Sequence, residues 1–463
     1  KNDVFQKLAS RIHTAEEGRS IVVFNPLPWT VCAPVEVPET AKRFLGDRVR
    51  VVDDSDKSVP VQGVTRRRVG SVDLAFLAEV PGLGYRTYRA LADLSEDSVA
   101  NTFDDGGVLC ADLNRLENDF WRIRLDPYSG DITSLLDKKA NVEILERGLS
   151  LCVMVDHSDT WAHDLVEWRV EDGRFRVKSA RVLELGACRA ALCVESEFGN
   201  STARILLTVY RDIPDIYVDA HIHWRERYRV LKLAFDTNIQ DGTATYDIPY
   251  GCIERKKTGC EEPGQSWIDL TGTAHTKDGN DIAYGFAVIN DSKFGYDILD
   301  RCMRITLLRS PAYAHHEPAR VKSTDPLRYL DQGEQTIRFR LVPHASSWQD
   351  AHIPRAAWEL NEPLWVHQES AHKGDLPQTA SFAECDTEHF VLTVVKFAED
   401  KNDIILRGYE SEGKAGTVKI RFPHWGREVS FAVTPHEIKT ARISPKCEST
   451  DVTETDLLED KIV

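Results

Sequence analysis

From Arg19 onward, the sequence shows the two-residue alternation of β-strands and almost none of the 3.6-residue period of helices. Apolar or alternating segments of strand length follow one another between turn residues, as in "SIVVFNPLPW", "LAFLAEVPGLGYRTYRAL", "LSLCVMVD" and "ARILLTVYRDIPDIYVDAHIHW". Strands at this density, without helices between them, are typical of sandwiches and not of a parallel α/β sheet. The sequence therefore predicts an all-β protein.

One hairpin can be predicted in detail. The segment "FWRIRL" at 120–125 alternates in the manner of a half-buried strand. Asp126-Pro127 restricts the backbone at the corner, and Gly130 can take the positive φ of a tight turn. A second strand then returns over residues 132–136.

The only convincing helical pattern lies at residues 1–12. Val4, Phe5, Leu8 and Ile12 fall on one face at helical spacing. We expect this short helix to be the last turns of a helical segment whose packing partners precede Lys1.

Length and charge limit the class of protein. A chain of 463 residues is too long for one core and should hold two to four domains. The net charge of -16, with no run of basic residues to offset it, argues against a nucleic-acid partner. No apolar run approaches the ~20 residues of a membrane helix, and no signal-peptide core stands at the start, so we expect no membrane partner.

The ten cysteines contain no C-x-x-C pair, and several lie in or beside apolar runs. This distribution favours reduced, mostly buried thiols, and it predicts a cytoplasmic protein.

The stretch "VDHSDTWAHD" at 155–164 has the residue types of a functional loop. His157, Asp159, His163 and Asp164 have the residue types of zinc ligands, or the aspartates could cap backbone N–H groups in a structural loop. His221 and His223 share a strand face, where they could bind a metal or simply form a polar outer surface.

Tryptophans leave a similar choice. Each could stack on a sugar ring, although in a sandwich a tryptophan is more often part of the core; the five considered are Trp121, Trp161, Trp168, Trp224 and Trp267. The sequence has no G-x-S-x-G, P-loop or G-x-G-x-x-G motif. Residue patterns alone therefore indicate a multi-domain β protein, with sugar binding as one option.

Several stretches, in collinear order, resemble the C-terminal half of glycoside hydrolase family 38, the zinc-dependent α-mannosidases. They include "IVVFNPLPW" (21–29), "VPGLGYRTY" (80–88), "LENDFWRIRLDPYSGDITSLLDKK" (116–139), "SDTWAHD" (158–164), "HWRERYRVLKLAF" (223–235), "IPYGCIER" (248–255), "YGFAVINDSKFGYD" (284–297), "ITLLRSP" (305–311) and "VLTVVKFAED" (391–400). The pattern is most similar to the bacterial, cytoplasmic branch of the family.

This resemblance implies a large β-sandwich of the galactose-mutarotase type, a supersandwich, with smaller β-sandwich domains. The expected division is 1–17, the end of a helical segment; 18–96, a small β domain; 97–375, the large sandwich; 376–446, a small C-terminal β domain; and 447–463, an acidic tail. We also expect a polar linker at 95–105 and a frayed tail at 448–460.

The resemblance also implies what is absent. In the family, the H-x-D zinc pair, the aspartate nucleophile and a further histidine lie in an N-terminal β/α barrel. None can be transferred to this sequence, since His157-Ser158-Asp159 only imitates H-x-D in another domain. No catalytic residue, metal ligand or cofactor is therefore assigned to this chain, and zinc is expected in the catalytic barrel.

The expected role is to cover the barrel and to line its sugar site with the loop at 156–164. The candidate substrate-binding residues are Asp156, Asp159, Trp161 and His163. The expected partners are α-mannosides and the catalytic domain, with a homo-oligomer left open. The alternatives are a stand-alone mutarotase-like enzyme and a carbohydrate-binding module. For Trp161 and Asp159, the competing interpretation is a core anchor and a turn cap.

Overall fold

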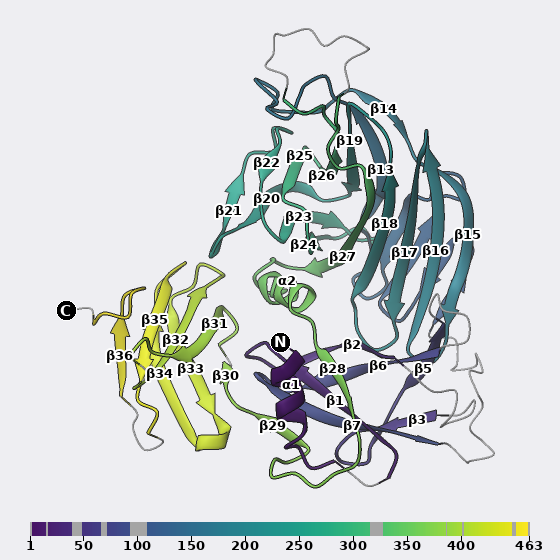
Figure 1. The fold of residues 1–463 in the computed structure, drawn as a ribbon. Coiled ribbons are helices and arrows are strands. Elements are labelled where there is room, and N and C mark those ends of the chain that lie inside the picture. Colours follow the sequence, from purple (N-terminus) through teal and green to yellow (C-terminus); the bar gives the residue numbers. More distant parts are fainter. Residues whose placement is uncertain are drawn as a thin grey trace. The chain divides into compact units, whose positions relative to one another are not determined.

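The computed structural model describes residues 2–14, 17–38, 49–65, 72–92, 109–314, 327–385, 387–400, 402–446 and 451–461. The chain forms two compact units (Figure 1). Unit 1 contains residues 1–103, 186–188 and 354–463, and unit 2 contains residues 104–185 and 189–353. The whole linker expected at 95–105 lies outside the described residues. The five-part domain division therefore stays a prediction.

Unit 2 is the large sandwich, and its first sheet has eleven strands. Its main path runs in the order β22-β25-β26-β19-β13-β11-β10-β9-β8, with β12 and β14 attached to β11 and β13. The strands are β8 (Cys110–Asp112), β9 (Arg115–Glu117), β10 (Trp121–Leu125), β11 (Ile132–Asp137), β12 (Val142–Glu143), β13 (Leu145–Val155), β14 (Glu171–Arg174), β19 (Arg229–Thr237), β22 (Glu262–Pro263), β25 (Gly295–Leu299) and β26 (Cys302–Arg309).

The second sheet of unit 2 has nine antiparallel strands in the order β15-β16-β17-β18-β27-β24-β23-β20-β21. They are β15 (Arg176–Leu185), β16 (Arg189–Phe198), β17 (Ser201–Tyr210), β18 (Ile216–Trp224), β20 (Gln240–Ile248), β21 (Gly251–Arg255), β23 (Trp267–His275), β24 (Asp281–Asn290) and β27 (Gly333–Ala345). Apolar side chains from both sheets form one continuous core.

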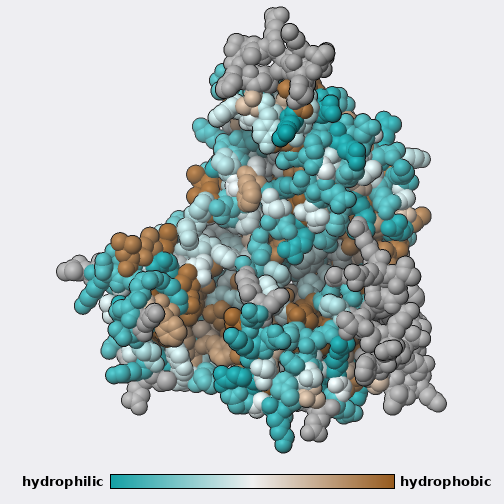
Figure 2. Space-filling view, viewed as in Figure 1, coloured by the Kyte–Doolittle hydropathy of each residue, from teal (hydrophilic) through white to brown (hydrophobic). Residues whose placement is uncertain are grey.

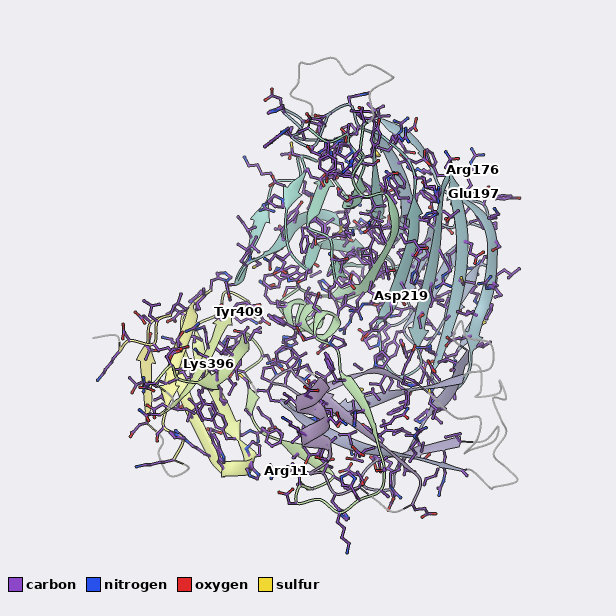
Figure 3. All side chains as sticks on the ribbon, viewed as in Figure 1. Arg11, Arg176, Glu197, Asp219, Lys396 and Tyr409 are labelled. Carbon is purple, nitrogen blue, oxygen red and sulfur yellow. The ribbon has the colours of Figure 1, made fainter. Side chains whose placement is uncertain are left out.

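Alternation along the strands decides which side chains enter that core. In β18, every second residue is buried, from Ile216 to Trp224, and the residues between them face outward. The outer face carries charge: Arg176 of β15 lies opposite Glu197 of β16, as Figure 3 shows. The visible surface of unit 2 is accordingly mostly hydrophilic (Figure 2).

The predicted hairpin is confirmed as β10 and β11, with Ile123 opposite Leu135. Gly130 has φ +76° at the turn. The Asp126 carboxylate accepts hydrogen bonds from the backbone N–H groups of Tyr128 and Ser129, at 2.8 and 2.7 Å. These bonds close the corner that the sequence places there.

Unit 1 contains two smaller pairs of sheets. The first pair joins β28-β1-β7-β3-β4 and β29 with β2-β6-β5, and the second joins β30-β33-β34 with β31-β32-β35-β36. Their strands are β1 (Arg19–Asn25), β2 (Val31–Val37), β3 (Val49–Val52), β4 (Ser58–Val59), β5 (Val61–Thr65), β6 (Val72–Val80), β7 (Gly84–Ala92), β28 (Trp365–Glu369), β29 (Thr379–Ser381), β30 (Glu384–Cys385), β31 (Phe390–Phe397), β32 (Ile404–Glu410), β33 (Gly416–Phe422), β34 (Arg427–Val433), β35 (Ile438–Ile443) and β36 (Val452–Thr455). Each pair encloses its own apolar core. The prediction of an all-β protein with one large and several smaller sandwiches is confirmed.

Two helices and one 3₁₀ turn complete the described residues: α1 (Asn2–Ala9), α2 (Ile353–Asn361) and η1 (Pro423–Trp425). The sequence pattern identified the first and missed the second. The signals in "IPRAAWEL" were a proline at the second position and apolar residues at helical spacing.

The apolar face of α1 differs from the predicted one. Ala9 and Ile12 are fully buried, whereas Val4 is 67% exposed. The Phe5 ring lies 4.9 Å from that of Phe24 in β1 and 5.1 Å from that of Trp365 in β28. The helix therefore packs on a sheet of its own unit, and the expectation that its partners all precede Lys1 is wrong.

The acidic tail also differs from expectation. Residues 452–455 form β36, which pairs with β35 along its whole length. The Glu459 carboxylate accepts the backbone N–H of Glu399 at 2.8 Å and pairs with Lys396 at 2.7 Å. The prediction of a frayed tail is therefore wrong for these residues, because backbone pairing and an ion pair replace the missing apolar burial.

Candidate functional site

The loop at 156–164 leaves the end of β13, where the apolar strand "LCVMV" gives way to polar residues. Asp156 is 1% exposed, and its backbone N–H donates to the carbonyl of Tyr228 at 2.9 Å. Its carboxylate accepts the backbone N–H of Ser158 at 3.1 Å. The first residue of the loop is therefore a buried anchor.

A guanidinium from β26, which is separated from β13 by β19 in the same sheet, holds the loop. Arg309 is the last residue of β26, and its Nε donates to Asp156 Oδ2 at 2.9 Å. Its Nη2 donates to the backbone carbonyl of Asp159 at 2.8 Å. Charge-assisted hydrogen bonds of this kind are among the stronger polar contacts in proteins, so one side chain fixes two points of the loop.

Asp159 shapes the turn. It is fully buried, and its Oδ1 accepts the backbone N–H of Trp161 at 2.8 Å. Its backbone forms an isolated parallel bridge with Ala312, and the Thr160 hydroxyl accepts the N–H of Ala314 at 3.0 Å. The competing interpretation of Asp159 as a turn cap is therefore confirmed in its geometry.

Trp161 and His163 point the other way. Trp161 is 65% exposed, and its ring stacks against the His163 imidazole with 6.3 Å between centroids and 21° between planes. Trp161 is thus no core anchor. Trp121, Trp168, Trp224 and Trp267 are all buried, which confirms the core interpretation for those four.

The four sequence-predicted site residues therefore divide into two pairs. Asp156 and Asp159 are buried and engaged in the loop's own hydrogen bonds, while Trp161 and His163 present flat rings to solvent. Sequence reasoning missed Arg309, which holds the loop from outside it. The signal was available in "ITLLRSP", where an arginine ends an apolar strand.

The structure gives no support to a metal site among the described residues. Among the described residues, no group of three or more His, Cys, Asp or Glu side chains is arranged to hold an ion. His221 faces outward from β18, with its Nδ1 3.2 Å from the Thr336 hydroxyl on β27. For this histidine the polar outer face is the interpretation that the structure supports.

A buried layer lies beneath the segment that follows the loop. Trp168 packs with Cys152 and Met154 of β13. Two cations lie over the Trp168 ring: the Arg309 guanidinium carbon is 5.2 Å from the ring centroid, and Lys232 Nζ is 5.6 Å from it. Lys232 is fully buried and pairs with Asp297 at 2.6 Å.

Burial raises the pKa of the Cys152 thiol to about 12, which favours the protonated form of this cysteine. The nine cysteines that the structure describes are all free thiols.

Comparison with known sequences identifies the family. The sequence model of the "Glycosyl hydrolases family 38 C-terminal domain" matches residues 116–317, and that of the "Glycosyl hydrolases family 38 C-terminal beta sandwich domain" matches residues 389–462. The chain belongs to glycosyl hydrolase family 38. Both models describe C-terminal domains of family 38, and the first includes the loop at 156–164 and Arg309.

Curated proteins similar to this chain are described as alpha-mannosidases. The chain is 22% identical over 424 residues to alpha-mannosidase G of Dictyostelium discoideum, covering 86% of this chain and 36% of the relative. It is 27% identical over 441 residues to alpha-mannosidase 2C1 of Mus musculus, covering 89% of this chain and 36% of the relative. The chain thus spans about a third of the length of these relatives.

Two solved structures show the same fold. An alpha-mannosidase from Enterococcus faecalis V583 superposes with a TM-score of 0.73 at 15% identity, covering 96% of this chain and 58% of that one. A protein of glycosyl hydrolase family 38 from Enterococcus faecalis gives a TM-score of 0.74 at 15% identity, covering 96% of this chain and 60% of that one.

Proposed function

We propose that this chain is the C-terminal β portion of a retaining α-mannosidase and that its loop at 156–164 lines the sugar site of the complete enzyme. The observation that carries the proposal is the exposed Trp161–His163 stack, held on a buried frame within the segment that matches family 38. Flat aromatic faces beside polar groups suit sugar rings, which have apolar faces and hydroxyl edges.

Within this proposal, the two outward side chains contact the sugar. Trp161 offers a stacking face, and His163 offers ring nitrogens that can donate to or accept from hydroxyls. Asp156 and Asp159 act on the sugar only by setting the loop's shape, because their carboxylates are already bound within it.

The reaction itself belongs to residues outside this chain. A retaining glycosidase uses one carboxylate as nucleophile and a second as acid and then base. Zinc, which we expect in the catalytic barrel, would orient sugar hydroxyls and stabilise developing charge there. Within this proposal, the chain supplies a wall of the sugar site.

The proposal carries three further expectations: the partner is the catalytic domain of the same polypeptide, the protein is cytoplasmic, and it belongs to the bacterial branch. Free thiols at all nine described cysteines support a reducing compartment. Within the described residues, neither helix has the length and apolar character needed to cross a bilayer.

The test is an assay of the purified chain on 4-nitrophenyl α-mannoside with added zinc. We expect only background hydrolysis, because the nucleophile and metal supply most of the transition-state stabilisation. The complete enzyme, expressed with its upstream barrel, should hydrolyse the same substrate. Turnover by the chain above a buffer blank would overturn the division of labour proposed here.

The same preparation separates the alternatives. An exposed aromatic stack is also what a carbohydrate-binding module uses. Such a module would bind methyl α-mannoside in calorimetry, and a longer polypeptide that contains it would still not hydrolyse the mannoside. A mutarotase-like enzyme would accelerate anomer exchange of a free hexose, followed by polarimetry.

A further inference from the structure

Arg309 makes more contacts with the loop at 156–164 and its surroundings than a simple ion pair would. Its guanidinium binds the Asp156 carboxylate and the Asp159 carbonyl, and its side chain is 18% exposed while that of Asp156 is 0% exposed. It also lies over the ring of Trp168, beyond the loop's end. One side chain therefore connects the start of the loop, its turn and the segment that follows.

The loop needs such a connection because its backbone is strained. Ala162 and Asp164 have φ of 49° and 58°, in the left-handed region that residues other than glycine rarely occupy. Conformations of this kind persist only where the surrounding structure fixes them. These two residues flank His163 and follow Trp161, so the strain lies where the two exposed rings are presented.

The chain of contacts from Arg309 to those rings is short. Arg309 holds the carbonyl of Asp159, and the carboxylate of Asp159 holds the N–H of Trp161. Arg309 is itself fixed at its backbone, where its N–H donates to Asp331 at 2.9 Å. The guanidinium thus transmits the position of a rigid strand to the ring of Trp161.

We propose that Arg309 is the positioning residue of this surface: it holds the loop in the strained conformation that stacks Trp161 on His163. Its consequence for sugar hydrolysis rests on the proposed function, but the positioning itself does not.

The experiment uses the 463-residue chain and needs no sugar. Chymotrypsin cleaves after exposed tryptophan, so the rate of cleavage after Trp161 reports how often the loop opens. We expect Arg309→Gln to raise that rate by about tenfold or more, since cleavage follows the population of the open form. Arg309→Lys keeps the charge but loses the forked geometry, and it should fall between the parent and Arg309→Gln.

A spectroscopic signature separates positioning from general stability. The emission of Trp161, obtained by subtracting the spectrum of Trp161→Phe, should be quenched less by acrylamide than in a His163→Ala background, because the stacked imidazole covers one face of the indole ring. Arg309→Gln should raise this quenching to the level of the His163→Ala background because the stack is lost.

The matched control is Arg340→Gln. Arg340 of β27 pairs with Asp215 at 2.7 Å in a similarly buried setting, with side chains 11% and 9% exposed. It should leave both the cleavage rate and the quenching within about twofold of the parent even if its melting temperature falls. If Arg309→Gln does not fold, Asp156→Asn replaces it, because it weakens the same contact from the other side.

The proposal would be overturned if a folded Arg309 or Asp156 variant kept the parent's cleavage rate and Trp161 quenching. It would also be overturned if Arg340→Gln changed both readouts as much as Arg309→Gln does. Failure of the proposed function would give a different result. The complete enzyme carrying Arg309→Gln would then keep the parent's kcat/KM, although faster chymotrypsin cleavage shows that its loop is released.

Discussion

At the scale of single residues, two tryptophans in one short segment have opposite roles. Trp161 is 65% exposed, and Trp168, seven positions later, is 8% exposed between two cations. The residue type is the same at both positions, and it is the fold that separates a surface platform from a buried anchor.

We predict that Trp161→Ala leaves the melting temperature nearly unchanged and lowers kcat/KM of the complete enzyme by roughly two- to tenfold, the range of one aromatic contact. Trp168→Ala is the matched control and should cost about 3–5 kcal/mol of unfolding free energy, because it removes a buried aromatic. Thermal unfolding and steady-state kinetics on both variants check this. A large melting drop in Trp161→Ala with normal kinetics per folded molecule would refute the surface role.

Asp247 predicts a pH dependence of stability. Burial raises the pKa of its carboxyl from 3.8 to about 6, although Ser266 donates two hydrogen bonds that favour the charged form. A raised acid pKa means that the folded state keeps a proton that the unfolded state releases. The contribution to stability is therefore fully present below pH 3.8 and is lost as the pH rises through about 6.

The corresponding variant is Asp247→Asn. Above pH 6 it should be more stable than the parent by up to ~3 kcal/mol, and the difference should shrink toward pH 4, since one pKa unit corresponds to about 1.4 kcal/mol. Urea unfolding of both proteins across this range gives the result. Parallel curves with a constant offset would contradict the assignment.

At the scale of elements, the turn of the β10–β11 hairpin offers a controlled test of packing. Gly130 has φ +76°, and a Cβ there would lie 3.1 Å from methyl groups of both Val177 and Val194. Gly279 has φ +86° in open space. Left-handed backbone strain costs roughly 1–2 kcal/mol for alanine at either position.

We therefore expect Gly130→Ala to destabilise unit 2 by about 1 kcal/mol more than Gly279→Ala, the added cost being overpacking against the two valines. Chemical unfolding of the two variants measures the difference directly. Equal losses would show that the facing strands move aside freely.

The strands and helices also show which structural features could be predicted from the sequence. Strand positions followed from alternation, and the φ of Gly130 followed from its turn, because both depend on local sterics. The face of α1 was misjudged at Val4, since a one-residue rotation of a short helix changes which side chains are buried.

Strand pairing and side-chain burial could not be predicted from local sequence, because both depend on residues that are distant in the chain. The pairing of β1 with β28 joins residues far apart in sequence, and no local pattern encodes it. The candidate loop was found by its residue types, but which of its four candidate residues face outward depends on Arg309, a partner from a distant strand.

At the scale of the whole molecule, the chain should not retain zinc. Among the described residues, no three potential ligands converge, and a tightly held zinc needs three or four. Elemental analysis after dialysis should therefore find well below one zinc per chain. A stoichiometric metal would contradict this, and repeating the measurement on His157→Ala and His163→Ala would show whether the loop holds it.

The architecture of unit 1 has a consequence for the order of events on the ribosome. Strand β1 pairs on one side with β7 and on the other with β28, where Phe24 lies opposite Trp365. All of unit 2 is synthesised between those two strands. At about 5–20 residues per second, β1 therefore waits tens of seconds for its second neighbour. During that interval unit 2 can finish folding while an apolar strand edge stays open, so nascent chains that stop before residue 365 should be the ones that aggregate or recruit chaperones.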